Sequence, residues 1–364
     1  MIDATRTVRI ALQRGGFDEK EREVARFDDM SVSAFRYTTG VEALRLSNRR
    51  GQVVVLPYLG QMVWSATFDG VDLAMTSMFP RPRRAKTIVE TYGCLAYHSG
   101  VWRNGVPSSD DDHPPHGEAP CADMDEAGLV FGADAGGWVT VTGVREYAMG
   151  FGPHYRATPS VTLRRNTAGC EIAMGVQNLS AAPMEVMYMC HTNFAFAEGA
   201  RIVQPVTFTP KHVVARTSIP GHIIPTPQYR TLIDTFAANP ARLSVLNESP
   251  LYDPEQVFYI KGLKRGPDGL VHFMLMRREG DAFGISWDPG SMPHCVRWIL
   301  DNKDQRVAAF AMPATCEPEG YTAEKRKGNV RLLASGASAE FTTNIAFFSR
   351  DEACAAAAAI EGTS

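Results

Sequence analysis

The pattern that decides the fold is clearest in residues 52–70, which read QVVVLPYLGQMVWSATFDG. Two short apolar runs, residues 52–57 and 62–68, flank a turn, and the second run ends at Asp69-Gly70. Runs of four to eight residues rich in β-branched and aromatic side chains, bounded by Gly, Pro, Asn or Asp, are typical of β-strands joined by tight turns. The segment therefore predicts antiparallel strands.

The same rhythm continues along most of the chain. Repeated strand-length runs at a spacing of about ten residues predict many antiparallel strands packed as an all-β sandwich. Only short helices are expected, at residues 232–237, 254–257 and 351–360. Further runs with this pattern lie at residues 138–144, 160–166, 171–178, 184–190, 270–277, 283–287, 307–312 and 339–348.

The chain of 364 residues shows no composition break that resembles a linker. We therefore expect one large sandwich domain at residues 31–350. Residues 1–30 include a mixed-charge stretch at 18–23 and are expected to form an N-terminal arm, helical or extended. Residues 351–364 are expected to form a C-terminal tail. A hydrophobic content of 45% is ample for a sizeable core.

Charge and motifs exclude several classes of function. The formal net charge is −3 with mixed signs throughout, so nucleic acid and anionic membrane are not expected partners. The chain has no apolar run of membrane-spanning length and its start has no signal-peptide pattern, so we expect a cytoplasmic protein. The seven cysteines are scattered, which predicts reduced thiols. Phosphate-binding glycine motifs and the serine-hydrolase elbow are absent, and no cofactor is expected.

Three polar clusters stand out against the strand pattern, and we expect them to converge. The first, residues 110–120, reads DDDHPPHGEAP and is too rich in Pro to be the interior of a helix or strand. The second, residues 190–199, reads CHTNFAFAEG and follows an apolar run, and the third, residues 316–321, reads CEPEGY. Loops with this composition often carry function.

These clusters resemble the aldose 1-epimerase (galactose mutarotase-like) superfamily, and most closely an uncharacterised bacterial branch of it. The similarity runs over residues 40–348, nearly the whole chain. It implies an all-β, galactose mutarotase-like β-supersandwich with few short helices and an open sugar cleft on one sheet. The residues that carry it are LSN at 46–48, QVVVLPYLG at 52–60, HGEAP at 116–120, the stretch 178–199 and CEPEG at 316–320.

The resemblance also implies an acid–base isomerisation of a free sugar. His116, followed by Gly117, matches the histidine that binds the sugar, and His191 matches the histidine that protonates the ring oxygen. The family's base is a glutamate immediately before a Pro-Ala pair, and here Met312 occupies that position. We therefore expect another carboxylate to act as the base, with Glu198 and Glu319 as the catalytic candidates.

Further polar residues in or near the clusters are expected to bind the sugar. A base and an acid acting together open a sugar ring, and an imidazole with a carboxylate is the natural couple because the surroundings can move their pKa values to either side of neutrality. Glu118, two residues after His116, is also a candidate base. The remaining predicted substrate-binding residues are His113, His98, Arg103, Asn193 and Glu317.

Other functions stay open at this stage. His113, His116, Glu118 and His191 could hold a metal in an open catalytic site, which would favour a metal-assisted sugar epimerase or a sugar-lactone hydrolase. With Met312 at the base position, a non-catalytic carbohydrate-binding protein is the third alternative. A small carbohydrate is the expected partner, and the sequence leaves open a homodimer.

Overall fold

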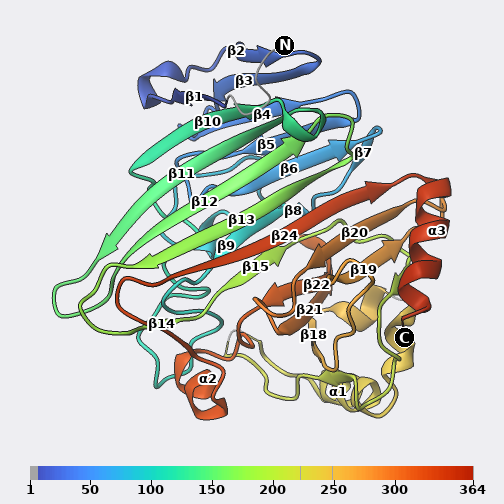
Figure 1. The fold of residues 1–364 in the computed structure, drawn as a ribbon. Helices are drawn as coiled ribbons and strands as arrows, with labels where there is room; N and C mark the ends of the chain where they lie inside the picture. Colours follow the sequence, from blue (N-terminus) through green and yellow to red (C-terminus); the bar gives the residue numbers. More distant parts are fainter. Residues whose placement is uncertain (1–6, 222, 248, 364) are drawn as a thin grey trace.

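The computed structural model describes residues 7–221, 223–247 and 249–363, and its strands form two large antiparallel sheets that pack face to face (Figure 1). The nine-stranded sheet has the order β1-β10-β11-β12-β13-β24-β20-β19-β16. The thirteen-stranded sheet has the order β17-β18-β21-β22-β15-β9-β6-β5-β4-β3-β2, with β7 beside β6 and β8 beside β22. The predicted all-β sandwich is confirmed.

The strands of the nine-stranded sheet are β1 Val8–Ala11, β10 Glu126–Gly132, β11 Trp138–Ala148, β12 His154–Arg164, β13 Gly169–Asn178, β16 Arg201–Val203, β19 Val271–Met276, β20 Ala282–Trp287 and β24 Ser338–Phe348. Those of the thirteen-stranded sheet are β2 Arg22–Phe27, β3 Met30–Arg36, β4 Glu42–Ser47, β5 Gly51–Val55, β6 Val63–Phe68, β7 Val71–Asp72, β8 Thr76–Ser77, β9 Ala96–Ser99, β15 Met189–Thr192, β17 Val213–Ala215, β18 Gln256–Ile260, β21 His294–Asp301 and β22 Gln305–Ala314. A small ribbon pairs β14 Met184–Val186 with β23 Arg331–Leu333. The helices are α1 Pro227–Ala238, α2 Tyr321–Lys327 and α3 Arg350–Glu361, and short 3-10 turns lie at Arg14–Gly16, Ile88–Glu90, Asp134–Gly136, Pro240–Ser244 and Ser249–Tyr252.

The segment at residues 52–70 forms the hairpin β5–β6 and the turn into β7. Val53 faces the core between the sheets, whereas Val54 faces a second apolar cluster on the other side of the sheet. A sheet buried on both faces needs continuous rather than alternating apolar residues, which explains the VVV run. The turn residues Asp69 and Gly70 have φ of 48° and 81°, as a tight two-residue hairpin turn requires.

Two of the three predicted helices are confirmed. Residues 232–237 lie within α1 and residues 351–360 within α3. The prediction for residues 254–257 is wrong, because β18 begins at Gln256 and pairs with β21. Helix α2 was not predicted, although three basic residues in its last turn and Gly328 at its C-cap, with φ of 76°, are ordinary helix-end signals.

The described segments near both ends of the chain take part in the sandwich. In the segment expected as an N-terminal arm, β1 pairs with β10 and β2 pairs with β3, so each extends the edge of one sheet (Figure 1). Helix α3, in the expected tail, covers the outer face of the nine-stranded sheet. There its buried Ala357 and Ile360 pack in one cluster with Met274 of β19.

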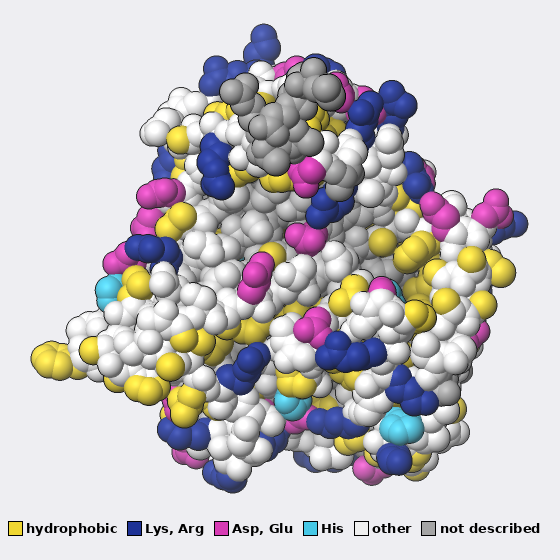
Figure 2. Space-filling view, viewed as in Figure 1, with side chains coloured by type: hydrophobic (Ala, Val, Ile, Leu, Met, Phe, Trp, Pro, Cys, Tyr) yellow, Lys and Arg dark blue, Asp and Glu magenta, His cyan; other side chains and the backbone are white. Residues whose placement is uncertain are grey.

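The surface and the cysteines agree with the composition. Basic and acidic side chains are interspersed over the face shown in Figure 2, without a field of one sign. All seven cysteines are free thiols, and burial raises the pKa of Cys190 to about 12. Among the residues that the structure describes, no helix is both long and apolar enough to cross a bilayer.

Candidate functional site

The register of the thirteen-stranded sheet places His191 in a row of side chains on the face turned away from the inter-sheet core. Strand β15 pairs with β22 through Met189 and Ala314, and continuing this register by two residues sets His191 beside Met312. On its other side, β9 sets Tyr97 opposite His191. Directly opposed residues of an antiparallel pair share a face and lie about 5 Å apart. Met312, at the position where the resemblance implies a catalytic base, is therefore the immediate neighbour of His191.

Aromatic rings surround His191. Its imidazole stacks on Tyr97 with the ring centroids 4.6 Å apart and an interplanar angle of 14°. The rings of His116 and Trp298 meet it edge-on, at centroid distances of 5.0 Å and 5.8 Å. The structure thus brings the two histidines of the first and second clusters into contact.

A hydrogen-bonded chain of phenols leads to His191. The Tyr92 hydroxyl lies 3.2 Å from His191 Nε2 and 3.2 Å from the Tyr97 hydroxyl. Burial, reinforced by the charge of His116, holds the pKa of His191 well below its usual range, while the side chain of Asn193 opposes that shift. His191 is 3% exposed and is therefore neutral at physiological pH.

The first cluster folds into a loop that holds His116 in a left-handed conformation, with φ of 63°. Its Nδ1 lies 3.1 Å from the hydroxyl of Ser99, the last residue of β9. The following Gly117 has φ of 78°, and a Cβ built there would lie 1.9 Å from the Arg103 carbonyl oxygen. Only glycine tolerates both the positive φ and the close approach of the carbonyl oxygen at position 117, so Gly117 holds the backbone that orients the His116 imidazole.

Glu118 holds this loop through its carboxylate. Its Oε1 accepts hydrogen bonds from the backbone N–H groups of Val101 and Trp102, at 2.9 Å and 2.8 Å, and from the Tyr155 hydroxyl at 2.6 Å. Its Oε2 accepts from the Arg103 N–H at 3.4 Å. A carboxylate that accepts four hydrogen bonds is a scaffold for the loop that carries His116.

His113 and Arg103 join the same loop to α2. The Tyr321 N–H donates to His113 Nε2 at 3.4 Å, and His113 Nδ1 lies 2.9 Å from the Pro114 carbonyl oxygen. The guanidinium of Arg103 lies between the rings of Trp102 and Tyr321, 3.9 Å and 3.6 Å from their centroids. It also donates to Glu185 at 3.1 Å. These contacts place both predicted residues in the support of the site.

The structure does not bring His98 or Glu198 to His191. His98 follows Tyr97 on β9 and so points to the opposite face, where its Nδ1 lies 2.9 Å from the Tyr188 hydroxyl in the inter-sheet core. Burial lowers the pKa of His98 to about 4. Glu198 is exposed and acts on the charge of Arg306, at the far end of β22. Six residues of strand separate that end from Met312, a distance of about 20 Å.

The third cluster contributes two carboxylates that are tied to basic groups. Glu319 accepts from Arg216 Nε at 2.8 Å, from the Ser218 hydroxyl at 3.0 Å, and from the Tyr259 hydroxyl. Tyr259 lies opposite Val296, which lies opposite Met312, so Glu319 flanks the His191 row from two strands away.

Glu317 is held by two lysines. It pairs with Lys261 and with Lys327, the latter at 2.7 Å. Burial opposes ionisation of Glu317, but both lysines favour it, and the net effect lowers the pKa of this carboxyl.

The second cluster places Asn193 beneath the row. Its side-chain amide donates to the Cys94 carbonyl at 3.0 Å, and the residue is fully buried. Asn193 thus braces the strand end that carries His191, and its side chain also opposes the lowering of the pKa of His191.

Glu255, just before β18, is a carboxylate that the sequence did not indicate. Its Oε2 accepts a hydrogen bond from Trp298 Nε1 at 2.7 Å, and the Trp298 ring contacts both His191 and Tyr92. The Glu255 charge also contributes to the raised pKa of Tyr92, after the larger effect of burial. The missing signal was the pairing of β18 with β21, because the sequence predicted a short helix at residues 254–257 instead.

An open groove of about 420 Å³ borders this aromatic layer. Trp64, Met75, Phe79 and Gly93 are among its lining residues, and Gly93 immediately follows Tyr92. Trp64 packs in the same cluster as Tyr97, and Met75 in the same cluster as Met312. The groove thus borders the two apolar clusters that contain Tyr97 and Met312.

The metal-ligand set considered from the sequence consists of His113, His116, Glu118 and His191. Within the described part of the chain, no three His, Cys, Asp or Glu side chains come together as a metal-binding group. His113 faces the backbone of α2, Glu118 faces backbone amides, and neither reaches the contact between His116 and His191. The ligand set considered from the sequence is therefore not assembled.

Comparison with known proteins identifies the family. A model described as a domain of unknown function, DUF4432, matches residues 38–347. The chain belongs to the DUF4432 family. The match contains the whole His191 row and all three polar clusters of this DUF4432 protein. No curated protein sequence matches the chain.

Solved structures show the fold of this DUF4432 protein. A "putative aldose 1-epimerase" from Klebsiella pneumoniae matches with a TM-score of 0.78 at 15% identity, over 98% of this chain and 94% of that chain. A galactose mutarotase-like protein from Clostridium acetobutylicum matches with a TM-score of 0.61 at 12% identity, over 88% and 99% of the two chains. The galactose mutarotase-like β-supersandwich predicted from the resemblance is confirmed.

Proposed function

We propose that this protein is a carbohydrate isomerase of the aldose 1-epimerase type, which acts on a free sugar or sugar derivative at its anomeric carbon. The observation that carries the proposal is the contact between His191 and His116 on one face of a mutarotase-like sheet, next to an aromatic layer. Two imidazoles held edge to face can exchange protons with two oxygen atoms of one small substrate.

The burial of the two histidines differs, which suggests their roles. Burial and the charge of His116 hold the pKa of His191 well below its usual range, so His191 is neutral and free to accept a proton, whereas His116 is the more exposed of the two. In the proposed reaction His191 accepts the proton of the anomeric hydroxyl while His116 protonates the ring oxygen. The bond between C1 and the ring oxygen breaks, C1 becomes an aldehyde, and ring closure on its other face returns both protons. The family resemblance suggested the opposite role, an acid, for His191.

Met312 explains why a second imidazole is needed. A thioether cannot carry a proton at neutral pH, so the position beside His191 supplies no base. Glu255 and Glu319 flank the row, the first through Trp298 and the second through Tyr259. In this proposal the negative charge of Glu255 acts on the Tyr92 and Tyr97 phenols. Glu319 accepts hydrogen bonds from sugar hydroxyls, and Arg216 donates hydrogen bonds to them. The aromatic layer offers a flat apolar surface for a pyranose ring.

The test is anomer exchange of a panel of aldoses and sugar acids, followed by proton NMR exchange spectroscopy on chelator-treated protein. His191→Asn is expected to lower the exchange rate by roughly 10²–10⁴-fold, the range for loss of one positioned proton transfer. Glu198→Gln is the matched control, because this exposed glutamate lies outside the row. Exchange that persists unchanged in His191→Asn would refute the role of the histidine.

A carbohydrate-binding protein without turnover is the second candidate. Met312 favours this candidate, because it occupies the position where the aldose 1-epimerase resemblance implies a catalytic base. Glu319 and Glu317 are already paired with the basic groups of Arg216 and Lys261. The same NMR samples separate the two functions. A binder shows saturable line broadening of one sugar with no exchange between its anomers, whereas an isomerase shows both.

A further inference from the structure

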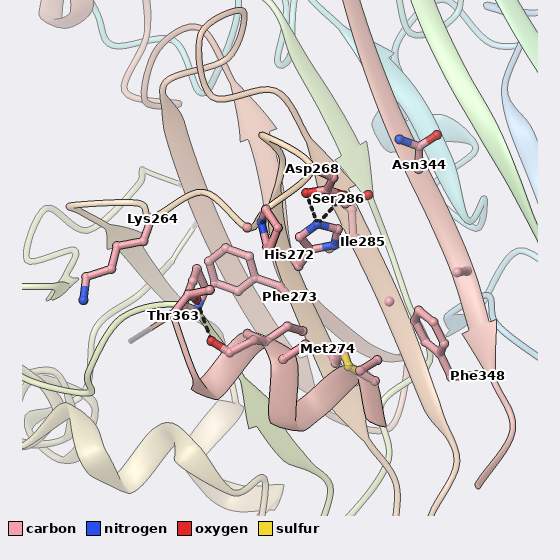
Figure 3. A pocket seen from close by; sticks show the side chains of 18 residues that line it. Lys264, Asp268, His272, Phe273, Met274, Ile285, Ser286, Asn344, Phe348 and Thr363 are labelled. Carbon is pink, nitrogen blue, oxygen red and sulfur yellow. Dashed lines mark hydrogen bonds and ion pairs between the residues drawn. The ribbon is translucent and has the colours of Figure 1, made fainter. Parts of the chain in front are cut away.

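A pocket of about 380 Å³ lies on the outer face of the nine-stranded sheet, between that face and α3 (Figure 3). Strands β19, β20 and β24 form its floor, and the last turns of α3 form one wall. The His191 row belongs to the other sheet, so the pocket is separate from the candidate functional site. Its volume lies within the range of about 300–1,000 Å³ that small-molecule sites occupy.

Several of the residues that line the hollow are small, among them Gly284, Ala356 and Ala359. Gly284 on β20 leaves room for the Phe348 ring, which would lie 2.3 Å from a Cβ at that position. On α3, Ala356 and Ala359 face the pocket with one carbon each, whereas Ala357 and Ile360 anchor the helix to the sheet. The helix therefore stays packed while an apolar space remains beside it.

One end of the pocket is polar. His272 Nε2 pairs with the Asp268 carboxylate at 2.9 Å. Beside them, Ser286 of β20 and Asn344 of β24 lie directly opposite each other in the sheet. Within the described residues neither side chain has a hydrogen-bond partner, although both line the pocket. Figure 3 shows His272, Asp268 and Ser286 grouped on one side, with Met274 and the helix on the other.

We infer that this pocket binds a small amphipathic molecule with an apolar body and an uncharged hydroxyl or amide head. The body packs on Met274, Phe348 and Ala356, and the head hydrogen-bonds to Ser286 and Asn344. An uncharged head fits because Ser286 and Asn344, which line this end of the pocket, are neutral groups that both donate and accept hydrogen bonds. Lys264 also lines the pocket, and Figure 3 shows its side chain directed away from His272. Polar groups at one end of an apolar pocket are the usual arrangement that orients a ligand.

The test uses 4-butylphenol as the probe, with butylbenzene and 4-butylbenzoate as analogues that lack the head or carry a charge. Binding is measured by saturation-transfer NMR and by the shift of the thermal midpoint. We expect saturable binding of 4-butylphenol, at least fivefold weaker binding of both analogues, and the same affinity in His191→Asn. The last result separates this pocket from the proposed isomerase site.

Two variants locate the binding. Ala356→Phe fills the apolar half and is expected to weaken 4-butylphenol binding at least tenfold, whereas Ala358→Phe, on an exposed position of the same helix, leaves it unchanged. Asn344→Val removes the head contact without filling the pocket, suits a strand, and is expected to weaken binding about fivefold. Absence of saturable binding to the wild type, or equal affinity in Ala356→Phe and Ala358→Phe, would overturn the inference.

Discussion

Replacing Glu118 by Gln should destabilise the loop that carries His116, and the loss can be worked out from its four hydrogen bonds. If the amide oxygen takes the place of Oε1, the donors Val101, Trp102 and Tyr155 keep an acceptor, but an uncharged one. Hydrogen bonds to charged groups contribute about 1.5–3 kcal/mol and neutral ones about 0.5–1.5 kcal/mol, so each of three bonds loses roughly 1 kcal/mol.

The remaining contact of Glu118 turns unfavourable in the same variant. The amide NH₂ would face the Arg103 N–H, which donated to Oε2 at 3.4 Å, so two donors oppose each other. Because Glu118 is only partly buried, solvent reduces the sum, and we expect a loss of about 2–3 kcal/mol in the free energy of unfolding.

The assay is equilibrium urea unfolding of the wild type, Glu118→Gln and Glu198→Gln. The exposed Glu198 controls for the loss of one surface charge and should change the unfolding free energy by less than about 0.5 kcal/mol. A Glu118→Gln protein as stable as the Glu198→Gln protein would show that the carboxylate does not hold the loop, and the scaffold assignment would have to be abandoned.

Two further predictions concern pH and backbone. The pKa of buried His98 is lowered to about 4, so the unfolded chain binds a proton at a higher pH than the folded chain does, and the free energy of unfolding falls as the pH drops from about 6.5 toward 4. His98→Gln should reduce this loss between pH 6.5 and 5 by about 1.5–2 kcal/mol. An unchanged dependence of stability on pH, measured by thermal or urea unfolding, would contradict this prediction. Gly117→Ala forces a Cβ against the Arg103 carbonyl oxygen, so it should lower the free energy of unfolding by about 2 kcal/mol or more and slow anomer exchange at least tenfold. The control is Gly336→Ala, with φ of 74° and open space around it, which should lower the free energy of unfolding by only about 1 kcal/mol and leave exchange unaffected. Equal effects of the two changes would rule out a role for the close approach at Gly117.

Local sequence determined most of the strands. The run at residues 52–70 contains both its strand residues and its turn residues, and tight turns depend on the conformational preferences of two or three neighbouring side chains. The alanine-rich segment that becomes α3 is likewise a strong helix former by itself. The helix predicted at residues 254–257 was wrong because four residues show too little periodicity to distinguish a helix from the start of a strand. The pairing of β18 with β21 makes Gln256 the first residue of a strand.

In the candidate site, too, some residues could be predicted from the sequence and others could not. The short motifs around His116 and His191 identified both histidines, which the structure places in contact. The sequence also suggested His98 and Glu198, and it missed Glu255. His98 lies next to Tyr97 in the chain, yet alternate residues of a strand point to opposite faces, and only the register shows which face carries His191.

The sequence by itself therefore determined the fold class and the turns, because each depends on residues close together in the chain, and the resemblance of its short motifs singled out the two histidines. Tertiary structure alone decided which side chains share the face of His191, that Glu118 and Arg103 support the loop, and that Glu255 reaches Trp298. Those relations join residues tens to hundreds of positions apart. Strand pairing between distant segments sets them, and no local pattern encodes its register.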